Sequence, residues 1–153
     1  EVHELTKAIE NRKQAKKRTK RYLQGMYDSY NSLFFVTLTF NEECLNRTNE
    51  KTRHSYASRF LNAHFRDYYA NVDYGAINER EHYHAVVSDE ITKQARIEWA
   101  QYGSINFKRM RGSREDVNRV GTYMRKLTNH ANKLSTGKSF HKRGMKQVDE
   151  LPF

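Results

Sequence analysis

Several short apolar runs in this chain have the composition and spacing of β-strands. The run 33–40 is rich in β-branched and aromatic residues, which favours a central strand. Residues 71–78 and 82–88 predict an antiparallel hairpin, and the second of these runs ends in an apolar, β-branched segment. Residues 104–110 alternate polar and apolar side chains, as a half-exposed strand does.

Other stretches of the chain have helical spacing. Residues 1–30 are basic with some apolar positions, and residues 51–70 carry a broad apolar stripe. Residues 91–102 predict a short helix that ends at Gly103. Ser113 can cap a last helix that runs to about residue 134. The residues expected to pack the short helix are Ile97, Trp99 and Ala100.

The order of these elements predicts an α+β fold. Its centre would be an antiparallel sheet of about four or five strands, RRM- or ferredoxin-like, with helices packed mainly on one face. Residues 33–134 would form this domain, after a basic helical segment at 1–32. A basic tail at 135–153 is expected to be loose or to fold only on binding. Residues 44–50 are expected to form a loop.

The composition indicates a nucleic-acid partner. The chain has 153 residues, which suits one domain, and its formal net charge is +10. So high a charge on a small protein indicates a polyanionic partner, usually nucleic acid. The residues expected to contact a DNA backbone are Lys13, Lys16, Lys17, Arg18, Lys20, Arg21, Arg80, Lys108, Arg109 and Arg111.

Composition also disfavours other classes of protein. No apolar run approaches the ~20 residues that span a bilayer, so no membrane partner is expected. Cys44 is the only cysteine, which excludes an internal disulfide and a metal site built from thiolates. No secretory signal opens the chain, so we expect it to act in the cytoplasm, that of a host cell if a virus or plasmid encodes it.

Two histidines stand at the start of the second hairpin strand. Because side chains alternate along a strand, His82 and His84 point to one face and Tyr83 to the other. Two imidazoles placed in this way can supply half of a metal site.

A third metal ligand follows from one local hypothesis. If Arg80 and Glu81 formed a two-residue turn, Glu79 would lie opposite His82 on the same face. Glu81 itself would point away from both histidines if the strand is regular.

Tyr123 and Lys126 are three residues apart on the last predicted helix, so they are neighbours on its surface. Gly121 lies just before them, and a glycine inside a helix costs up to ~1 kcal/mol relative to alanine. That cost suggests close passage of a ligand. Taken alone, these residues are better explained as a packed tyrosine and a solvated lysine.

The order of these motifs resembles the HUH endonucleases, and more narrowly the replication initiator (Rep) proteins of single-stranded DNA phages and plasmids. The resemblance covers about residues 34–126, most of the chain. It implies an enzyme that nicks and joins single-stranded origin DNA to start rolling-circle replication. The motifs that carry it are the strand at 33–40, His82 with His84, Trp99 followed by Gly103, and Tyr123 with Lys126.

The resemblance implies a role for each site residue. His82 and His84 would hold a divalent ion, Mn²⁺ or Mg²⁺, and Asp73 would be the acidic third ligand in place of the glutamate considered above. Tyr123 would attack the DNA and leave a 5′-phosphotyrosine. Lys126 would favour the ionised phenol or hold the phosphate.

The chain also departs from the family pattern. Leu127 and His130 stand where many relatives carry a second tyrosine and a second lysine, which implies an enzyme with a single nucleophile. No P-loop is present, so a host helicase and polymerase are expected partners. Two alternative functions are a tyrosine transposase of the same superfamily and a noncatalytic nucleic-acid-binding module with an RRM-like sheet.

Overall fold

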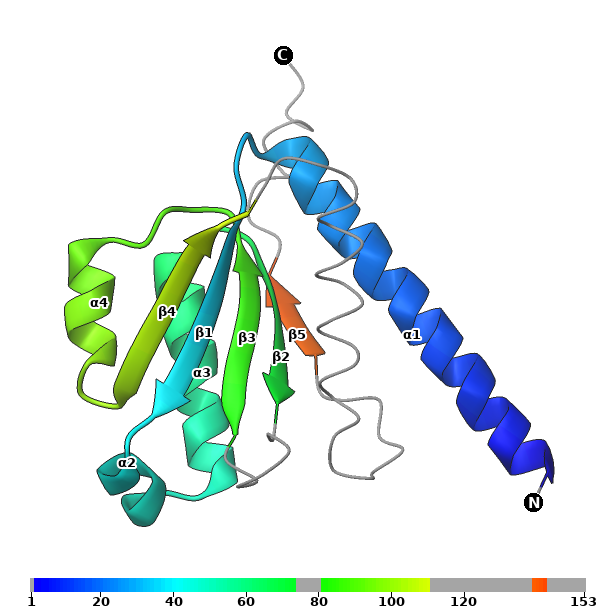
Figure 1. Cartoon of the computed structure of the whole chain (residues 1–153), viewed down its shortest axis with the longest axis horizontal. Coiled ribbons are helices and arrows are strands. Elements are labelled where there is room, and N and C mark those ends of the chain that lie inside the picture. Colours follow the sequence, from blue (N-terminus) through cyan, green and yellow to red (C-terminus); the bar gives the residue numbers. More distant parts are fainter. Residues whose placement is uncertain (1, 74–80, 111–138, 143–153) are drawn as a thin grey trace, which may run out of the picture.

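The protein is built on a five-stranded antiparallel sheet with strand order β4-β1-β3-β2-β5 (Figure 1). The computed structural model describes residues 2–73, 81–110 and 139–142. In chain order the elements are α1 (Val2–Ser29), β1 (Phe34–Phe40), α2 (Glu42–Arg47), α3 (Glu50–His64), β2 (Tyr68–Asp73), β3 (His82–Val87), α4 (Lys93–Trp99), β4 (Gly103–Arg109) and β5 (Ser139–Lys142).

The topology confirms the predicted α+β class. From β1 to β4 the strands and the main helices follow the order β-α-β-β-α-β, and these four strands are arranged 4-1-3-2 in the sheet. This is the ferredoxin-like arrangement of two split βαβ units. Strand β5 extends the sheet beyond β2.

The larger core lies between one face of the sheet and the helices α3 and α4. Along β1 burial alternates, and every second side chain from Phe34 to Phe40 is buried on this face. Helix α3 contributes Phe60 and Leu61 to the core, and α4 contributes Trp99, which is fully buried. Strand periodicity therefore gives the sheet one continuous apolar face.

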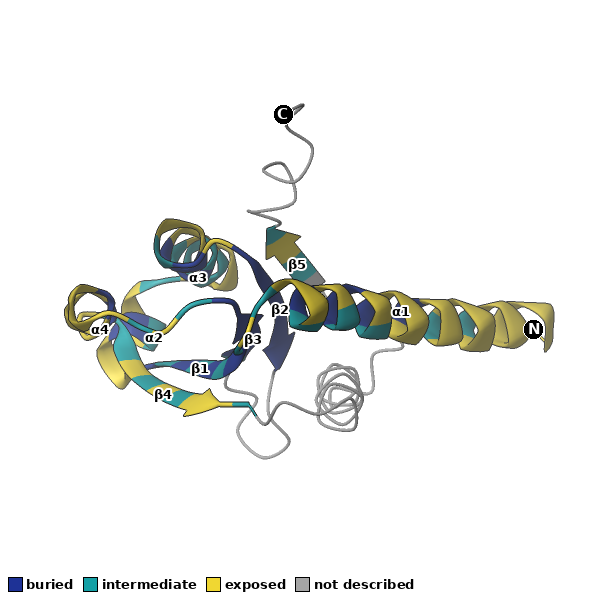
Figure 2. Cartoon of the chain, turned by 90° about the horizontal axis from the view of Figure 1, so that it is seen from above, coloured by how far each residue is buried: buried dark blue, intermediate teal, exposed yellow. Residues whose placement is uncertain are grey.

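A smaller core lies on the other face, under the end of α1. The buried residues there are Tyr22, Leu23 and Met26 of the helix with Leu33, Tyr69 and Val86. A hydrogen bond of 2.7 Å between Thr19 Oγ1 and the Tyr69 hydroxyl also joins α1 to β2. The basic N-terminal helix is therefore attached to the sheet, although it reaches beyond it at its N-terminal end (Figure 2).

Two predictions about helices are wrong: one helix was predicted as a loop, and another ends earlier than predicted. Residues 44–50 were expected to be a loop, but α2 covers Glu42–Arg47, because the Asn41 side chain accepts the Cys44 N–H and caps a first turn with two acidic residues. The predicted helix 51–70 ends at His64, and Tyr68 and Tyr69 belong to β2. Every residue of β2 is buried, so the strand lacks the alternation that would separate it from a helix.

The packing of α4 also differs from the prediction. Ile97 is 61% exposed and Ala100 is exposed, whereas Ala95 and Trp99 are buried. Ala95 and Trp99 are four residues apart and so lie on the same side of the helix. This one side packs α4 against the core, and the other residues of the helix stay exposed.

Part of the predicted loose tail is a strand. Residues 139–142 form β5 and pair with β2 from Tyr68 to Asn71. Lys142 Nζ donates hydrogen bonds to the carbonyls of Asn62 and Phe65, at 2.9 and 3.3 Å, which satisfies acceptors at the C-terminal end of α3. None of the described helices is long and apolar enough to cross a membrane.

Trp99 and Gly103 meet at one carbonyl group at the end of β1. The Trp99 Nε1–H donates to the Thr39 oxygen at 3.2 Å. A Cβ on Gly103 would lie 1.8 Å from the same oxygen, so no side chain fits there. The spacing of this tryptophan and glycine is therefore explained by packing against β1.

A pair of glycine substitutions tests this packing. Gly103→Ala should lower the free energy of unfolding by about 3 kcal/mol, because the new methyl group overlaps backbone atoms that cannot move aside. Gly25→Ala is the matched control: nothing lies within 4 Å of its added Cβ, and it should stabilise α1 by about 0.5–1 kcal/mol. Urea denaturation measures both, and equal values for the two variants would show that Gly103 does not pack tightly against the Thr39 carbonyl.

Candidate functional site

The polar part of the sheet lies on the face opposite the larger core, beyond the residues covered by α1. The alternation of side chains brings polar groups from three adjacent strands to this face. Cross-strand pairing sets their neighbours: His84 lies between Thr37 and Asn71, and Asp73 is paired with His82. We call the set Thr37, Asn71, Asp73, His82 and His84 the polar sheet site.

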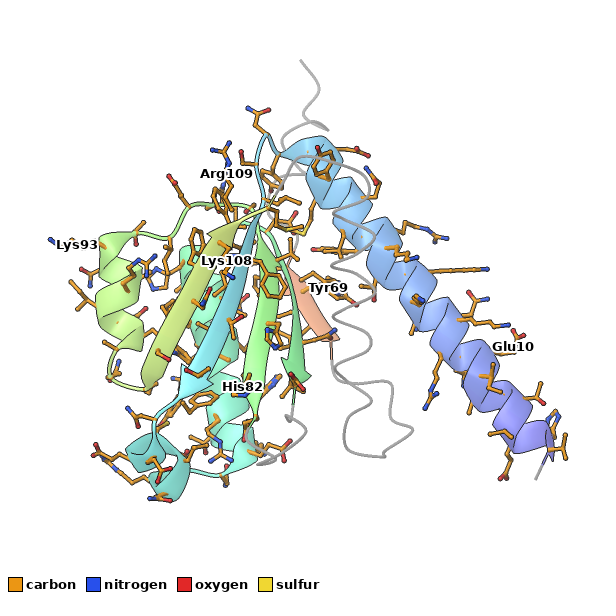
Figure 3. All side chains as sticks on the ribbon, viewed as in Figure 1. Glu10, Tyr69, His82, Lys93, Lys108 and Arg109 are labelled. Atoms are coloured by element: carbon orange, nitrogen blue, oxygen red, sulfur yellow. The ribbon has the colours of Figure 1, made fainter. Side chains whose placement is uncertain are left out.

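The predicted orientation of the histidine strand is confirmed. Tyr83 is buried in the larger core, where its hydroxyl lies 3.2 Å from His54 Nδ1 on α3. His84 lies on the other face, with its ring stacked on Phe35 at 5.6 Å between centroids. His82 is half-buried at the end of β3 at which the chain enters the strand (Figure 3).

Both nitrogens of His84 have polar neighbours. Its Nδ1 lies 3.1 Å from Thr37 Oγ1, and its Nε2 lies 3.4 Å from Asp73 Oδ2. His84 is 7% exposed and Asp73 is 5% exposed, so both groups are held away from bulk water. A proton on Nδ1, donated to Thr37, would leave the Nε2 lone pair directed toward Asp73.

The separation of His84 and Asp73 fits a shared divalent ion. His84 Nε2 and Asp73 Oδ2 lie 3.4 Å apart, so an imidazole nitrogen and a carboxylate oxygen would both be available to one divalent ion, such as Mn²⁺. Thr37 would then hold the other ring nitrogen, as the outer partners of metal-bound histidines do.

The third ligand is not in position as the side chains stand. Within the described residues, no three histidine, cysteine, aspartate or glutamate side chains form a group that could hold a metal ion. The rings of His82 and His84 are 6.4 Å apart between centroids, although both belong to the same face. His82 would have to change rotamer to join an ion between His84 and Asp73.

The register favours one of the two carboxylates considered from the sequence. Asp73, not Glu79, is the residue paired with His82 across the β2–β3 ladder. The two-residue turn that would have placed Glu79 there requires a different pairing. Glu79 itself lies outside the described residues.

Glu81 points to the opposite side of the sheet, as predicted, and forms a buried ion pair with Arg53 of α3. Arg53 Nε donates to Glu81 Oε1 at 2.6 Å, and the two side chains are only 12% and 5% exposed. Burial raises the pKa of the Glu81 carboxyl above its usual value, and Arg53 opposes that rise.

Arg53 also holds the chain around the start of β3. Its Nη1 donates to the carbonyls of Thr48 and Leu45, at 2.6 and 3.3 Å. One guanidinium therefore joins the end of α2, helix α3 and the residue that precedes His82. Sequence reasoning missed Arg53, since nothing in its local pattern separates it from a solvated arginine.

Two other site residues were missed, but the sequence held a signal for them. Phe35 and Thr37 alternate with the buried residues of the first apolar strand, so strand periodicity places them on the face that carries His84. They border the histidine on the neighbouring strand.

The basic residues named from the sequence fall into two groups. On α1, Lys13, Lys16, Lys17, Arg18 and Arg21 are exposed and Lys20 is half-buried. On β4, Lys108 and Arg109 are exposed; Lys108 is paired with Phe35, at the end of the face nearer α1, and Arg109 donates to Ser32 at 2.7 Å (Figure 3). Arg80, Arg111, Tyr123 and Lys126 lie outside the described residues, so the predicted meeting of the tyrosine with the histidines stays a prediction.

Comparison with known proteins adds little. No family model and no curated protein sequence matches this chain. A solved structure with a similar backbone is that of the hypothetical protein ORF119 from Sulfolobus islandicus rod-shaped virus 1, with a TM-score of 0.45 and 16% sequence identity. The match covers 71% of this chain and 91% of that chain. A similarity of this size carries no argument about function.

Removing Arg53 should destabilise the site from the far side of the sheet. Arg53→Met leaves the Glu81 carboxylate buried without its partner, so the free energy of unfolding at pH 7 should fall by about 3 kcal/mol. Burial already raises the pKa of Glu81 in the folded state, so its protonation favours folding, and the loss should shrink as the pH falls below neutrality through that raised pKa.

Two further variants separate the charge effect from general damage. Adding Glu81→Leu to Arg53→Met should recover part of the loss, because no unpaired charge remains. Arg59→Met is a matched control on the same helix, exposed and lying over the Tyr56 ring, and should cost under about 1 kcal/mol. The single variant Glu81→Leu completes the comparison. If the loss of unfolding free energy in the double variant equals the sum of the losses in the two single variants, the ion pair does not hold the start of β3.

Proposed function

We propose that this protein is a metal-dependent endonuclease of the HUH type that nicks and rejoins single-stranded origin DNA during rolling-circle replication. The observation that carries the proposal is the separation of 3.4 Å between His84 Nε2 and Asp73 Oδ2 on a sheet face that also carries His82. The ordered motifs of the sequence support it independently.

The chemistry assigns different tasks to the sheet and to the last sequence motif. An ion held by Asp73, His84 and a reoriented His82 would polarise the scissile phosphate and compensate its charge. Tyr123 is the proposed nucleophile: its oxygen attacks the phosphorus as the 3′ oxygen of the preceding nucleotide leaves. The products are a 5′-phosphotyrosine and a free 3′-hydroxyl, and attack by that hydroxyl reverses the step and joins the strand.

Lys126 is the proposed partner of the tyrosine. A phenol has a pKa near ~10, so an adjacent ammonium group favours the reactive phenolate. The strand itself is held by basic groups that contact phosphates and by aromatic rings, such as Phe35, on which unpaired bases can stack. The replicative helicase and polymerase would come from the host.

Removing the hydroxyl oxygen of Tyr123 tests whether this residue is the nucleophile. Tyr123→Phe should abolish the covalent protein–DNA product formed with Mn²⁺ and labelled single-stranded origin candidates, while the affinity for the uncut strand stays within about twofold. Tyr56→Phe, on α3 and stacked against Tyr102, is the matched control and should keep the product. An adduct that persists in the Tyr123 variant would move the nucleophile elsewhere. Binding with no adduct in any of the proteins would favour the noncatalytic module.

The metal site is tested by calorimetry with Mn²⁺ alone. His84→Ala, His82→Ala and Asp73→Ala should each weaken binding by at least about tenfold, because each removes a ligand. His3→Ala, exposed on α1, should leave the affinity unchanged. If Glu79→Ala weakens binding more than Asp73→Ala does, the third ligand is Glu79 and not the residue paired with His82.

A further inference from the structure

Helix α1 extends well beyond the domain to which it is attached. Its buried residues are Ala15, Thr19, Tyr22, Leu23 and Met26, whereas every residue from 2 to 14 is exposed or half-buried. Both views show the N-terminal part of the helix leading away from the sheet, with Glu10 far from β2 and β3 (Figures 1, 2 and 3). We call residues 2–21 the arm.

Among the described helices and strands, the arm has the highest proportion of basic residues. Between residues 7 and 21 Glu10 is the only carboxylate. At about 1.5 Å per residue the charged stretch is about 21 Å long. Its basic residues are Lys7, Arg12, Lys13, Lys16, Lys17, Arg18, Lys20 and Arg21, of which Arg12 and Lys20 are half-buried and the others exposed.

The arm carries charge without aromatic side chains. None of the tyrosines, phenylalanines or the tryptophan of the chain occurs in residues 2–21; the first is Tyr22, where the helix meets the sheet. Proteins that bind single-stranded nucleic acid combine positive charge with aromatic rings on which bases stack. The sheet has such rings and the arm has none, so the arm suits a partner whose bases are already paired.

The geometry points to double-stranded DNA as the partner of the arm. A helix about 10–12 Å in diameter fits the major groove of B-DNA, which is about 12 Å wide, and B-DNA presents one phosphate charge per about 1.7 Å of its axis. We infer that α1 holds a duplex by its phosphates while the sheet face takes a single strand. The substrate would then be a junction between duplex and single-stranded DNA, and this part of the inference rests on the proposed function.

The exposed aliphatic residues of the arm fit an anionic membrane less well. Val2, Leu5 and Ile9 are exposed on the first turns, before most of the basic residues. Helices that lie in a membrane interface carry their basic residues beside an apolar face with tryptophan, phenylalanine or leucine along its length. In the arm that face continues into Arg12 and Lys16 instead of further apolar side chains.

Two variants of equal net charge test the arm. Lys13→Gln/Lys17→Gln removes two exposed charges one turn apart on the arm, and Lys51→Gln/Lys93→Gln removes two exposed charges from α3 and α4. Glutamine and lysine have similar helix propensities, so both proteins should keep the wild-type circular dichroism. The probe is a labelled blunt duplex of random sequence, with affinity measured by fluorescence anisotropy over a series of salt concentrations.

The expected result is a change in salt dependence confined to the arm variant. The slope of log K against log salt should become shallower by about 1.8 in Lys13→Gln/Lys17→Gln, at about 0.9 per lost phosphate contact, and should not change in Lys51→Gln/Lys93→Gln. Equal slopes for the two variants would overturn the inference. An equal change with oligo-dT would also overturn it, because the arm would then not discriminate duplex from single strand. The inference would also be overturned if the arm variant lost binding to phosphatidylserine vesicles while its binding to the duplex stayed unchanged.

Cleavage measured in parallel separates this inference from the proposed function. The ratio of the nicking rate on an oligonucleotide joined to a duplex to the rate on the same oligonucleotide alone should fall in Lys13→Gln/Lys17→Gln and stay unchanged in Lys51→Gln/Lys93→Gln. If no protein cleaves DNA but the salt slopes for the duplex still differ, the arm binds duplex DNA and the proposed nicking activity is wrong. If all the proteins cleave and the slopes agree, the nicking activity is supported and duplex binding by the arm is wrong.

Discussion

Strand β3 determines the site because buried side chains fix its register on both faces. Tyr83, Ala85 and Val87 lie in the larger core, and Val86 lies in the smaller core under α1. A slip of one residue would exchange the two faces and place the histidines in the larger core. The apolar half of the strand therefore holds its polar half in position, and the same register pairs Asp73 with His82.

The second face of the sheet has two halves that differ in chemistry. At one end, Leu23 and Met26 of α1 exclude water from Tyr69 and Val86. Further along the same strands the side chains become polar, and His84 contacts Thr37 and Asp73. Because α1 is anchored at the first end, it covers part of the face and still carries its basic residues away from the domain. The same helix therefore stabilises the sheet with its C-terminal part and exposes basic residues along its N-terminal part.

The sequence predicted those features that depend on side-chain periodicity. Alternation around Tyr83 was enough to assign the two histidines to one face, and the β-branched run at 33–40 was enough to find the central strand. Periodicity failed for β2, whose six residues are all buried, and so placed Tyr68 and Tyr69 in a helix. It also failed for β5, whose four residues form a strand only because the edge of β2 accepts them.

Long-range contacts explain what the sequence could not give. The pairing of Asp73 with His82 depends on a register that the intervening residues do not reveal, since Glu79 is nearer in sequence. The contact of Arg53 with Glu81 joins residues far apart in the chain and has no local pattern. The capping of α2 by Asn41 is different, because the asparagine and the acidic first turn were visible in the sequence and their meaning was missed.

The most direct measurement of the central claim is paramagnetic broadening by Mn²⁺ in the NMR spectrum of the isotope-labelled protein. Substoichiometric Mn²⁺ broadens the nuclei nearest its binding site first. A metal ion bound at the polar sheet site should make the signals of Asp73, His82, His84 and Thr37 disappear at the lowest additions, with the indole of Trp99 on the opposite face affected later. Broadening that begins at the acidic start of α2, around Glu42 and Glu43, with the histidine signals intact would contradict this prediction.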